Sequence, residues 1–318
     1  MSSETPLVSV ITPAYNAARF IGRTLGALRA QTFFDFEAIV VDDGSTDATA
    51  DETLAAIAGD PRFRLIRQPN AGVAVARNRA LSLARGRYVA NLDADDLWAP
   101  TFLERTVAAL EGAGEAATFA FARSLWIDSD DVQIGGEPPR LEAPVDYREI
   151  LVRNPVGNGS AALMRRSAVA KAGGYDAGLV RDFGQTEDWQ LLLELAAQGP
   201  VLVVEAPLVL YRIHATSSSH SLERSVAGAL EVIRRQMRTG RAPRRDYWAA
   251  RSLSLIWLAR RAETQGHVRQ ALKLAAMAYV TNPLWITLPE LRAPLLGPFR
   301  RLARYRARRA LAAQPSRS

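Results

Sequence analysis

The chain has 318 residues, a hydrophobic fraction of 48% and a formal net charge of +7. A chain of this length can bury a large core, and usual domain sizes predict one large domain with or without a smaller appendage. Cys is absent, which excludes disulfides, thiolate metal sites and cysteine nucleophiles. The N-terminus shows no signal-peptide pattern and no apolar run is long enough to cross a bilayer, so we expect a cytoplasmic protein.

The charge is unevenly distributed along the chain. Residues 1–220 carry 20 basic and 28 acidic side chains, whereas residues 221–318 carry 20 basic and 5 acidic ones. An acidic region suits a cation site, and a basic region suits anionic lipid or nucleic acid. The two parts are therefore expected to meet different partners.

Apolar strands alternate with helical patterns in the first third of the chain. Strands are predicted at residues 7–11, 36–41, 63–66 and 88–92, and helices near 17–31, 46–58, 73–84 and 101–111. This alternation predicts an α/β fold with a Rossmann-like, doubly wound, mainly parallel sheet. Ligands of such sheets bind beyond the carboxyl ends of the strands.

The remaining elements follow a less regular course. A strand at 116–126 precedes an irregular region at 128–144, and further elements are predicted at 165–172, 187–197 and 201–211. Beyond residue 220 the pattern is helical and rich in Arg, with helices near 222–238, 245–264 and 268–281. We place a domain boundary near 220.

Three carboxylates, Asp93, Asp95 and Asp96, directly follow the strand at 88–92. Carboxylate oxygens suit Mg²⁺ or Mn²⁺, and Mg²⁺ usually takes one or two of them together with substrate phosphates. Alternatively, Asp95 or Asp96 only caps the next helix. A second acidic turn contains Asp43, whose carboxylate could bind a base or ribose or could simply shape the turn.

Five segments in fixed order carry a family resemblance. They are Val8-Ser-Val-Ile-Thr-Pro-Ala-Tyr-Asn16, Gln31-Thr-Phe33, Val40-Val-Asp-Asp-Gly-Ser-Thr-Asp47, Asn70-Ala-Gly-Val-Ala-Val-Ala-Arg-Asn78 and Leu92-Asp-Ala-Asp-Asp96. In this combination they closely resemble the family 2 glycosyltransferases of the GT-A fold. The resemblance implies a catalytic domain at 1–220, with a nucleotide-sugar half at about 1–112 and an acceptor half at about 113–220. The Arg-rich helical region at 221–318 would follow it.

The resemblance also implies roles for the donor-side residues. Pro13, Tyr15 and Asp43 would line the nucleoside pocket, Arg77 would lie near the base or diphosphate, and Asp93 would bind the donor nucleotide. Asp95 would hold the divalent cation that bridges the donor phosphates. Without the family context, Tyr15 would be a ring packed on the sheet edge and Arg77 a solvated helix residue.

Three further residues resemble family positions on the acceptor side. Asp188, at the start of a predicted helix, matches the catalytic base, and an inverting displacement needs such a base opposite the leaving phosphate. Its neighbour Glu187 would bind acceptor or orient the loop, although both acids could simply complement the helix dipole. His214 matches a position near the metal or diphosphate and could equally be a packed residue, and Asn158 lies in the expected acceptor loop.

The resemblance predicts an inverting enzyme that moves a sugar from a nucleotide-diphosphate-sugar to a saccharide or lipid-linked acceptor, in surface-glycan synthesis. The rival is a catalytically silent nucleotide-sugar-binding or scaffolding protein of the same fold. A dehydrogenase is excluded because no glycine fingerprint follows the first strand.

The tail combines apolar and basic segments. Residues 283–299 are apolar and broken by proline, and six arginines follow within residues 300–309. We expect residues 283–309 to meet the anionic inner face of the cell membrane. A solvated terminal helix or an oligomer contact is the alternative. Nucleic acid is not expected, because no binding module accompanies the charge.

Overall fold

A computed structural model describes residues 5–135, 145–184, 186–214, 221–264 and 266–281. The chain divides into two compact units. The first contains residues 1–150 and 154–220, and the second contains residues 151–153 and 221–318. Residues 283–309, for which the sequence predicts contact with a membrane, lie outside the described residues.

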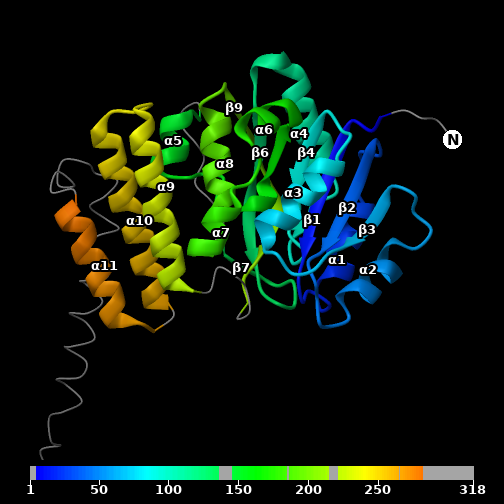
Figure 1. Cartoon of the computed structure of the whole chain (residues 1–318), viewed down its shortest axis with the longest axis horizontal. Coiled ribbons are helices and arrows are strands. Elements are labelled where there is room, and N and C mark those ends of the chain that lie inside the picture. Colours follow the sequence, from blue (N-terminus) through cyan, green and yellow to red (C-terminus); the bar gives the residue numbers. More distant parts are fainter. Residues whose placement is uncertain (1–4, 136–144, 185, 215–220, 265, 282–318) are drawn as a thin grey trace, which may run out of the picture. The chain divides into compact units, whose positions relative to one another are not determined.

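The first unit is built on a nine-stranded sheet in the order β3-β2-β1-β4-β8-β6-β9-β5, with β7 paired to β6 (Figure 1). The strands are β1 (Val8–Ala14), β2 (Phe36–Asp42), β3 (Phe63–Arg67), β4 (Tyr88–Asn91), β5 (Leu97–Trp98), β6 (Phe119–Ile127), β7 (Gln133–Gly135), β8 (Ala162–Arg165) and β9 (Val201–Arg212). Strands β3, β2, β1 and β4 run parallel to one another, and β6 runs parallel to β9. The short strands β5, β7 and β8 pair antiparallel. The predicted α/β fold with a mainly parallel sheet is confirmed.

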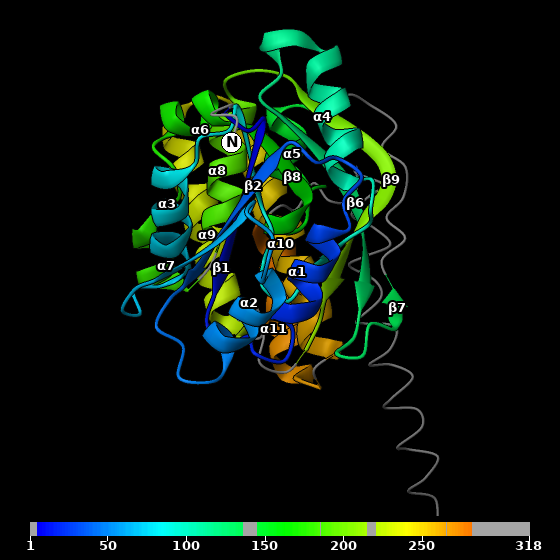
Figure 2. The same ribbon diagram turned by 90° about the vertical axis from the view of Figure 1, so that its right-hand side faces the viewer.

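Helices lie on both sides of the strands of this unit (Figure 2). They are α1 (Ile21–Arg29), α2 (Thr49–Ile57), α3 (Val73–Leu83), α4 (Phe102–Gly112), α5 (Tyr147–Val152), α6 (Arg166–Ala172), α7 (Ala177–Phe183) and α8 (Glu187–Ala196). All seven residues of β1 and of β2 are buried. Parallel strands covered on both faces need such continuous apolar runs, and this is why the sequence predicts them well.

Helices α1 and α2 begin later than predicted. The backbone N–H of Ala17 donates to Thr49 Oγ1 (2.7 Å), and that of Ala18 donates to Asp47 Oδ2 (3.2 Å). These bonds join the segment before α1 to the segment before α2. The residues predicted to form the first turn of each helix therefore form loops instead. Sequence periodicity does not detect them because the partners are about 30 residues apart.

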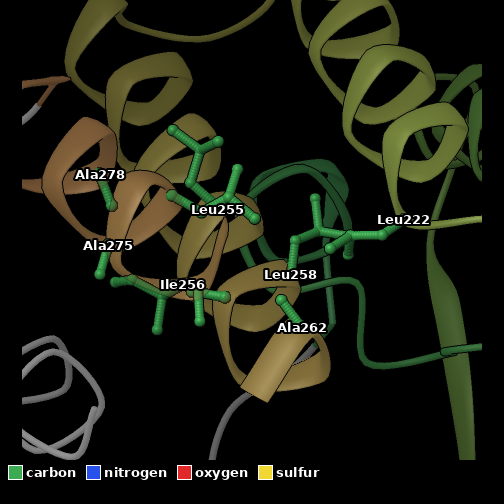
Figure 3. Close-up of a cluster of buried hydrophobic side chains, with 10 residues drawn as sticks. Leu222, Leu255, Ile256, Leu258, Ala262, Ala275 and Ala278 are labelled. Carbon is green, nitrogen blue, oxygen red and sulfur yellow. The ribbon is translucent and has the colours of Figure 1, made fainter. Parts of the chain in front are cut away.

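The second unit contains three long helices, α9 (Leu222–Thr239), α10 (Arg244–Thr264) and α11 (Val268–Thr281). Its core gathers Leu222 of α9, Leu255, Ile256 and Leu258 of α10, and small residues such as Ala275 of α11 (Figure 3). Gly240 ends α9 in the left-handed conformation that glycine favours at helix ends. Within the described residues, every helix is too short or too polar to cross a bilayer.

Candidate functional site

Most donor-side residues lie at or directly after the carboxyl ends of β1, β2 and β4. The ends of β1 and β2 are in register, since Ala14 pairs with Asp42. Tyr15, directly after β1, is 53% exposed, so about half of its surface is open to a ligand. Pro13 is buried within β1 opposite Val41.

Asp43 organises the loop that leads into α3. Its buried carboxylate accepts hydrogen bonds from the Gln68 side chain (2.7 Å) and from the N–H groups of Ala71 (2.9 Å) and Gly72 (2.8 Å). A charged acceptor with three donors stabilises a loop strongly. The turn-shaping role is therefore present in the structure, and contact of Asp43 with a nucleoside stays a prediction.

Arg77 is a buried junction between the donor and acceptor sides. Its Nε donates to Asn91 Oδ1 (2.9 Å), its Nη2 donates to Asp93 Oδ1 (2.7 Å), and its Nη1 bonds Glu187 at the start of α8. Burial opposes the charge of this guanidinium, but the carboxylates of Asp93 and Glu187 outweigh it and raise the pKa well above its ordinary value. The alternative of a solvated helix arginine is wrong, because only 4% of the residue is exposed.

The two acids that open α8 have different surroundings. Glu187 is buried against Arg77, and burial raises its pKa to about 7. Asp188 is half-buried and accepts a hydrogen bond from the N–H of Trp189 (2.7 Å). Burial raises the pKa of Asp188, and the charge of Arg77 partly offsets this. Asp93 also acts on Asp188, so the two clusters of acids converge around Arg77.

The residue before these acids has an unusual backbone. Thr186 adopts φ of +82° directly before α8. A β-branched residue in this region is strained, and such strain gathers at functional sites. The turn at Thr186 thus sets the direction in which Glu187 and Asp188 leave the backbone.

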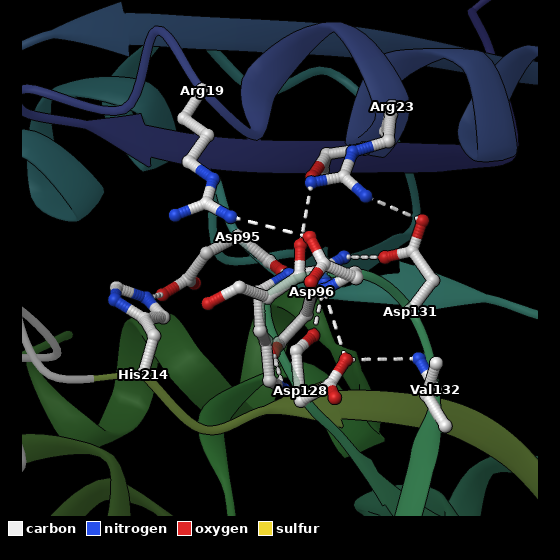
Figure 4. A network of polar contacts seen from close by, with 12 residues as sticks. Arg19, Arg23, Asp95, Asp96, Asp128, Asp131, Val132 and His214 are labelled. Atoms are coloured by element: carbon white, nitrogen blue, oxygen red, sulfur yellow. Dashed lines mark hydrogen bonds and ion pairs between the residues drawn. The ribbon is translucent and has the colours of Figure 1, made fainter.

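Asp95 faces His214, and the two side chains meet with Oδ2 and Nε2 2.9 Å apart (Figure 4). The ring of His214 also contacts the ring of Phe20, with centroids 4.7 Å apart. The helix-cap alternative for Asp95 and Asp96 is wrong, because α4 begins at Phe102 with Thr101 before it. Asp95 and His214 together could offer a cation one oxygen and one nitrogen ligand.

Asp96 is fully buried and serves the fold. Its carboxylate accepts hydrogen bonds from Ser160 Oγ (2.6 Å) and from the N–H of Arg212 (2.9 Å). Burial raises its pKa well above the ordinary value, and the charges of Asp95 and Asp93 add to the effect. Neighbouring carboxylates of one acidic triplet thus have different surroundings.

Asn158 belongs to a short turn that contacts this centre. Its side chain accepts from the N–H of Ser160 (3.1 Å) and donates to Ser124 Oγ (2.8 Å). At Gly159 a Cβ would lie 3.2 Å from Arg77 Nη2 and 3.4 Å from Asp93 Oδ2, so glycine allows the close approach. The expected acceptor loop therefore touches the donor-side acids.

Three residues of the site received no role from the sequence. Asn91 holds Arg77 and Asp93, Ser160 also accepts from the N–H of Asp93 (3.0 Å), and Arg212 donates from Nε to the carbonyl of Asp95 (2.6 Å). All three lie in or next to segments that predicted the site. Their tasks depend on long-range contacts, which one sequence does not reveal.

A divalent cation fits this donor set. Among the described residues, no group of three or more His, Cys, Asp or Glu side chains could hold a metal by itself. Mg²⁺ and Mn²⁺ sites that act on nucleotides need only one or two carboxylates, because phosphates and waters fill the other positions. Asp95, with His214 beside it, meets this requirement.

Residues 9–173 match the family model described as glycosyl transferase family 2. The chain belongs to this family. The matched stretch contains the donor-side acids and the 158–160 turn. It ends before Asp188 and His214, so their roles rest on the geometry and on the sequence pattern.

The chain is also similar in sequence or in fold to individual proteins. The putative teichuronic acid biosynthesis glycosyltransferase TuaG of Bacillus subtilis is 46% identical over 106 residues, which are 33% of this chain and 42% of TuaG. The mannosyltransferase PcManGT of Pyrobaculum calidifontis, solved in complex with GDP-Man and Mn²⁺, shares the fold with a TM-score of 0.61 and 22% identity. That match covers 93% of this chain and 86% of PcManGT. S. aureus TarS in complex with UDP-GlcNAc matches with a TM-score of 0.59 and 16% identity, over 92% of this chain and 89% of that one.

Proposed function

We propose that this protein is an inverting glycosyltransferase that moves a sugar from a nucleotide-diphosphate-sugar to an acceptor hydroxyl. The observation that carries the proposal is the junction at Arg77. It connects the acids that follow β4 with the acids that open α8. This connection supports a single site that serves both the donor and the acceptor.

Asp188 is the proposed catalytic base. A base must take the proton of the attacking hydroxyl on the face opposite the leaving diphosphate. Partial burial raises the pKa of Asp188, which makes the carboxylate a better proton acceptor than a solvated one. Glu187, bonded to Arg77, keeps the start of α8 in position.

On the donor side, Pro13, Tyr15 and Asp43 would line the nucleoside pocket, and Arg77 with Asp93 would define its floor. Asp95, with His214 beside it, would hold a divalent cation. PcManGT supports this assignment, since that protein was solved with GDP-Man and Mn²⁺. When bound, the cation would neutralise charge on the leaving diphosphate.

The acceptor is proposed to be a saccharide or lipid-linked saccharide of a surface polysaccharide, as the name of TuaG suggests for that relative. We further propose a peripheral position on the inner face of the cell membrane, reached through residues 283–309. A catalytically silent protein of the same fold is the rival. It would have no need for a half-buried base next to the Arg77 junction.

A two-step measurement tests the proposal. UDP-, GDP- and dTDP-sugars are first screened with Mn²⁺ by thermal shift, because a ligand at about 100 times its Kd stabilises the fold by about 2.7 kcal/mol. The responding donor is then mixed with a panel of saccharide acceptors and followed by ¹H NMR. Consumption of the donor with inversion at the anomeric carbon supports the proposal. A donor that binds and is never consumed identifies the silent protein.

A further inference from the structure

Trp126 is an exposed indole at the carboxyl end of β6. It is 44% exposed, although tryptophan is usually largely buried. The residue opposite it on β7 is Gly135, where a Cβ would lie only 3.3 Å from Trp126 Cε3. The glycine therefore leaves room for the indole to lie across the neighbouring strand.

The strand register places Trp126 on the same side of the sheet as the 158–160 turn. Side chains two residues apart on a strand share a face, so Trp126 lies on the face of Ser124, which bonds Asn158. In the next strand Tyr211 pairs with Trp126, and Val209 pairs with Ser124. Val209 in turn pairs with Trp98, whose Nε1 donates to the carbonyl of Ser160 (2.8 Å). The pairings of β6 with β9 and of β9 with β5 thus both place Trp126 on the face of the sheet that the 158–160 turn contacts.

A short chain of contacts connects this surface with the site. Asn158 bonds Ser124, and Ser160 in the same turn bonds the N–H of Asp93. On the other side of Trp126 in the chain, the carbonyl of Asp128 accepts from Arg212 Nη1 (2.6 Å), and Arg212 Nε also donates to the Asp95 carbonyl. Residues on both sides of Trp126 in the chain are thus connected to the acids that follow β4.

We infer that the indole of Trp126, with Tyr211 beside it, forms a saccharide subsite that stacks against a pyranose ring of the acceptor. This inference rests on the proposed function. The C–H face of a pyranose is apolar and packs on an aromatic face, while its hydroxyls remain free for polar partners. An exposed indole next to half-buried polar side chains offers both kinds of contact.

The acidic side chains that follow β6 are ion-paired. Asp130 pairs with Arg19 (3.3 Å) and Asp131 pairs with Arg23 (2.6 Å). The surface next to Trp126 therefore offers anionic lipid no excess of positive charge to bind. A neutral sugar needs no such excess, because its hydroxyls can donate to carboxylates and accept from guanidinium groups.

The test uses the full chain and compares Trp126→Ala, Trp126→Phe and a control, Phe34→Ala. Phe34 is 71% exposed and precedes β2, at the opposite edge of the sheet from Asp42. The probes are the methyl β-glycosides of glucose, galactose, mannose and N-acetylglucosamine, with 1-hexanol as an apolar probe. Binding is measured by saturation-transfer NMR, and donor consumption is measured in the same preparations.

The expected result is saturation of the ring C–H protons of at least one glycoside. Trp126→Ala should weaken that binding by about fivefold, while Trp126→Phe and Phe34→Ala should stay close to wild type. The inference is overturned if no glycoside binds the wild-type chain, if Trp126→Ala binds equally well, or if hexanol competes as well as the sugars. Donor consumption separates the two claims. If the chain consumes donor but glycoside binding does not change in Trp126→Ala, the subsite alone is disproved. If the chain never consumes donor, the proposed function is disproved.

Discussion

Asp95 and Asp96 are neighbours in sequence with opposite environments. The Asp95 side chain is 31% exposed and meets His214, whereas Asp96 is fully buried between Ser160 and Arg212. We therefore expect Asp95→Asn to abolish the stabilisation that Mn²⁺ adds to nucleotide binding, with a change in unfolding free energy below about 0.5 kcal/mol.

Asp96→Ala is the contrasting variant. It would leave the Arg212 N–H and the Ser160 hydroxyl without their acceptor and cost about 2 kcal/mol of stability. Thermal shift with and without UDP and Mn²⁺ measures both effects. Normal metal-dependent binding by Asp95→Asn would place the cation elsewhere.

Glu187 should make stability depend on pH. Burial raises its pKa from 4.5 to about 7, so the folded chain keeps a proton that the unfolded chain has already lost. The free energy of unfolding is therefore higher at low pH. It declines as the pH rises from about 4.5 to about 7, by at most about 1.4 kcal/mol per pH unit.

Glu187→Gln removes the titrating group and should flatten this part of the profile. Urea unfolding near pH 5 and near pH 7.5 gives the comparison, with Glu52→Gln on the exposed side of α2 as the matched control. Parallel profiles for wild type and Glu187→Gln would contradict the burial of a titrating carboxyl here.

The sequence predicts many single residues of the candidate site. It does not predict the hydrogen bonds that connect them. Asp93, Asp95 and Asp188 stand out because carboxylates follow a strand or open a helix. Arg77 looks like a solvated helix residue until the fold buries it. Its three partners lie 14, 16 and 110 residues away in the chain.

The loop between β2 and α2 shows how elements define the pocket. Gly44 has φ of +74°, and a Cβ there would lie 2.6 Å from the backbone nitrogen of Asn70. Gly44→Ala should therefore destabilise the fold by at least about 2 kcal/mol and weaken nucleotide binding, because the loop that Asp43 organises must shift.

Gly22→Ala is the control for this substitution. Gly22 lies in α1 with nothing within 4 Å of the added Cβ, and the change should stabilise by about 0.5 to 1 kcal/mol. Chemical denaturation checks both variants. Equal stability for Gly44→Ala and wild type would show that the loop at Gly44 is not packed against Asn70 as described.

Sequence reasoning succeeded with the elements that repeat. Strands β1, β2 and β4 are buried along their whole length and alternate with helices, which periodicity detects. The strand β7 fell in a region expected to be irregular. It has three residues, and two of them are exposed, so it lacks an apolar pattern.

At the scale of the whole molecule, the chain joins an acidic first part with a basic second part. We propose that the units at 1–220 and 221–318 correspond to catalysis and to attachment. Near an anionic surface each basic side chain contributes about 1 kcal/mol, so the arginines of 300–309 would suffice for binding.

Flotation with phosphatidylserine liposomes compares the full chain with a chain that ends at residue 281. The full chain should float at low salt, and the shortened chain should remain below. Equal behaviour would disprove the membrane proposal and favour a solvated helix or an oligomer contact.

The central claim is that acids from two distant parts of the chain serve one reaction, with Asp188 as its base. The most direct measurement is the activity of Asp188→Asn, which preserves shape and removes the proton acceptor. Transfer should fall by about a thousandfold or more while donor binding with Mn²⁺ remains within about twofold. An Asp188→Asn variant that transfers sugar at the wild-type rate would contradict the account.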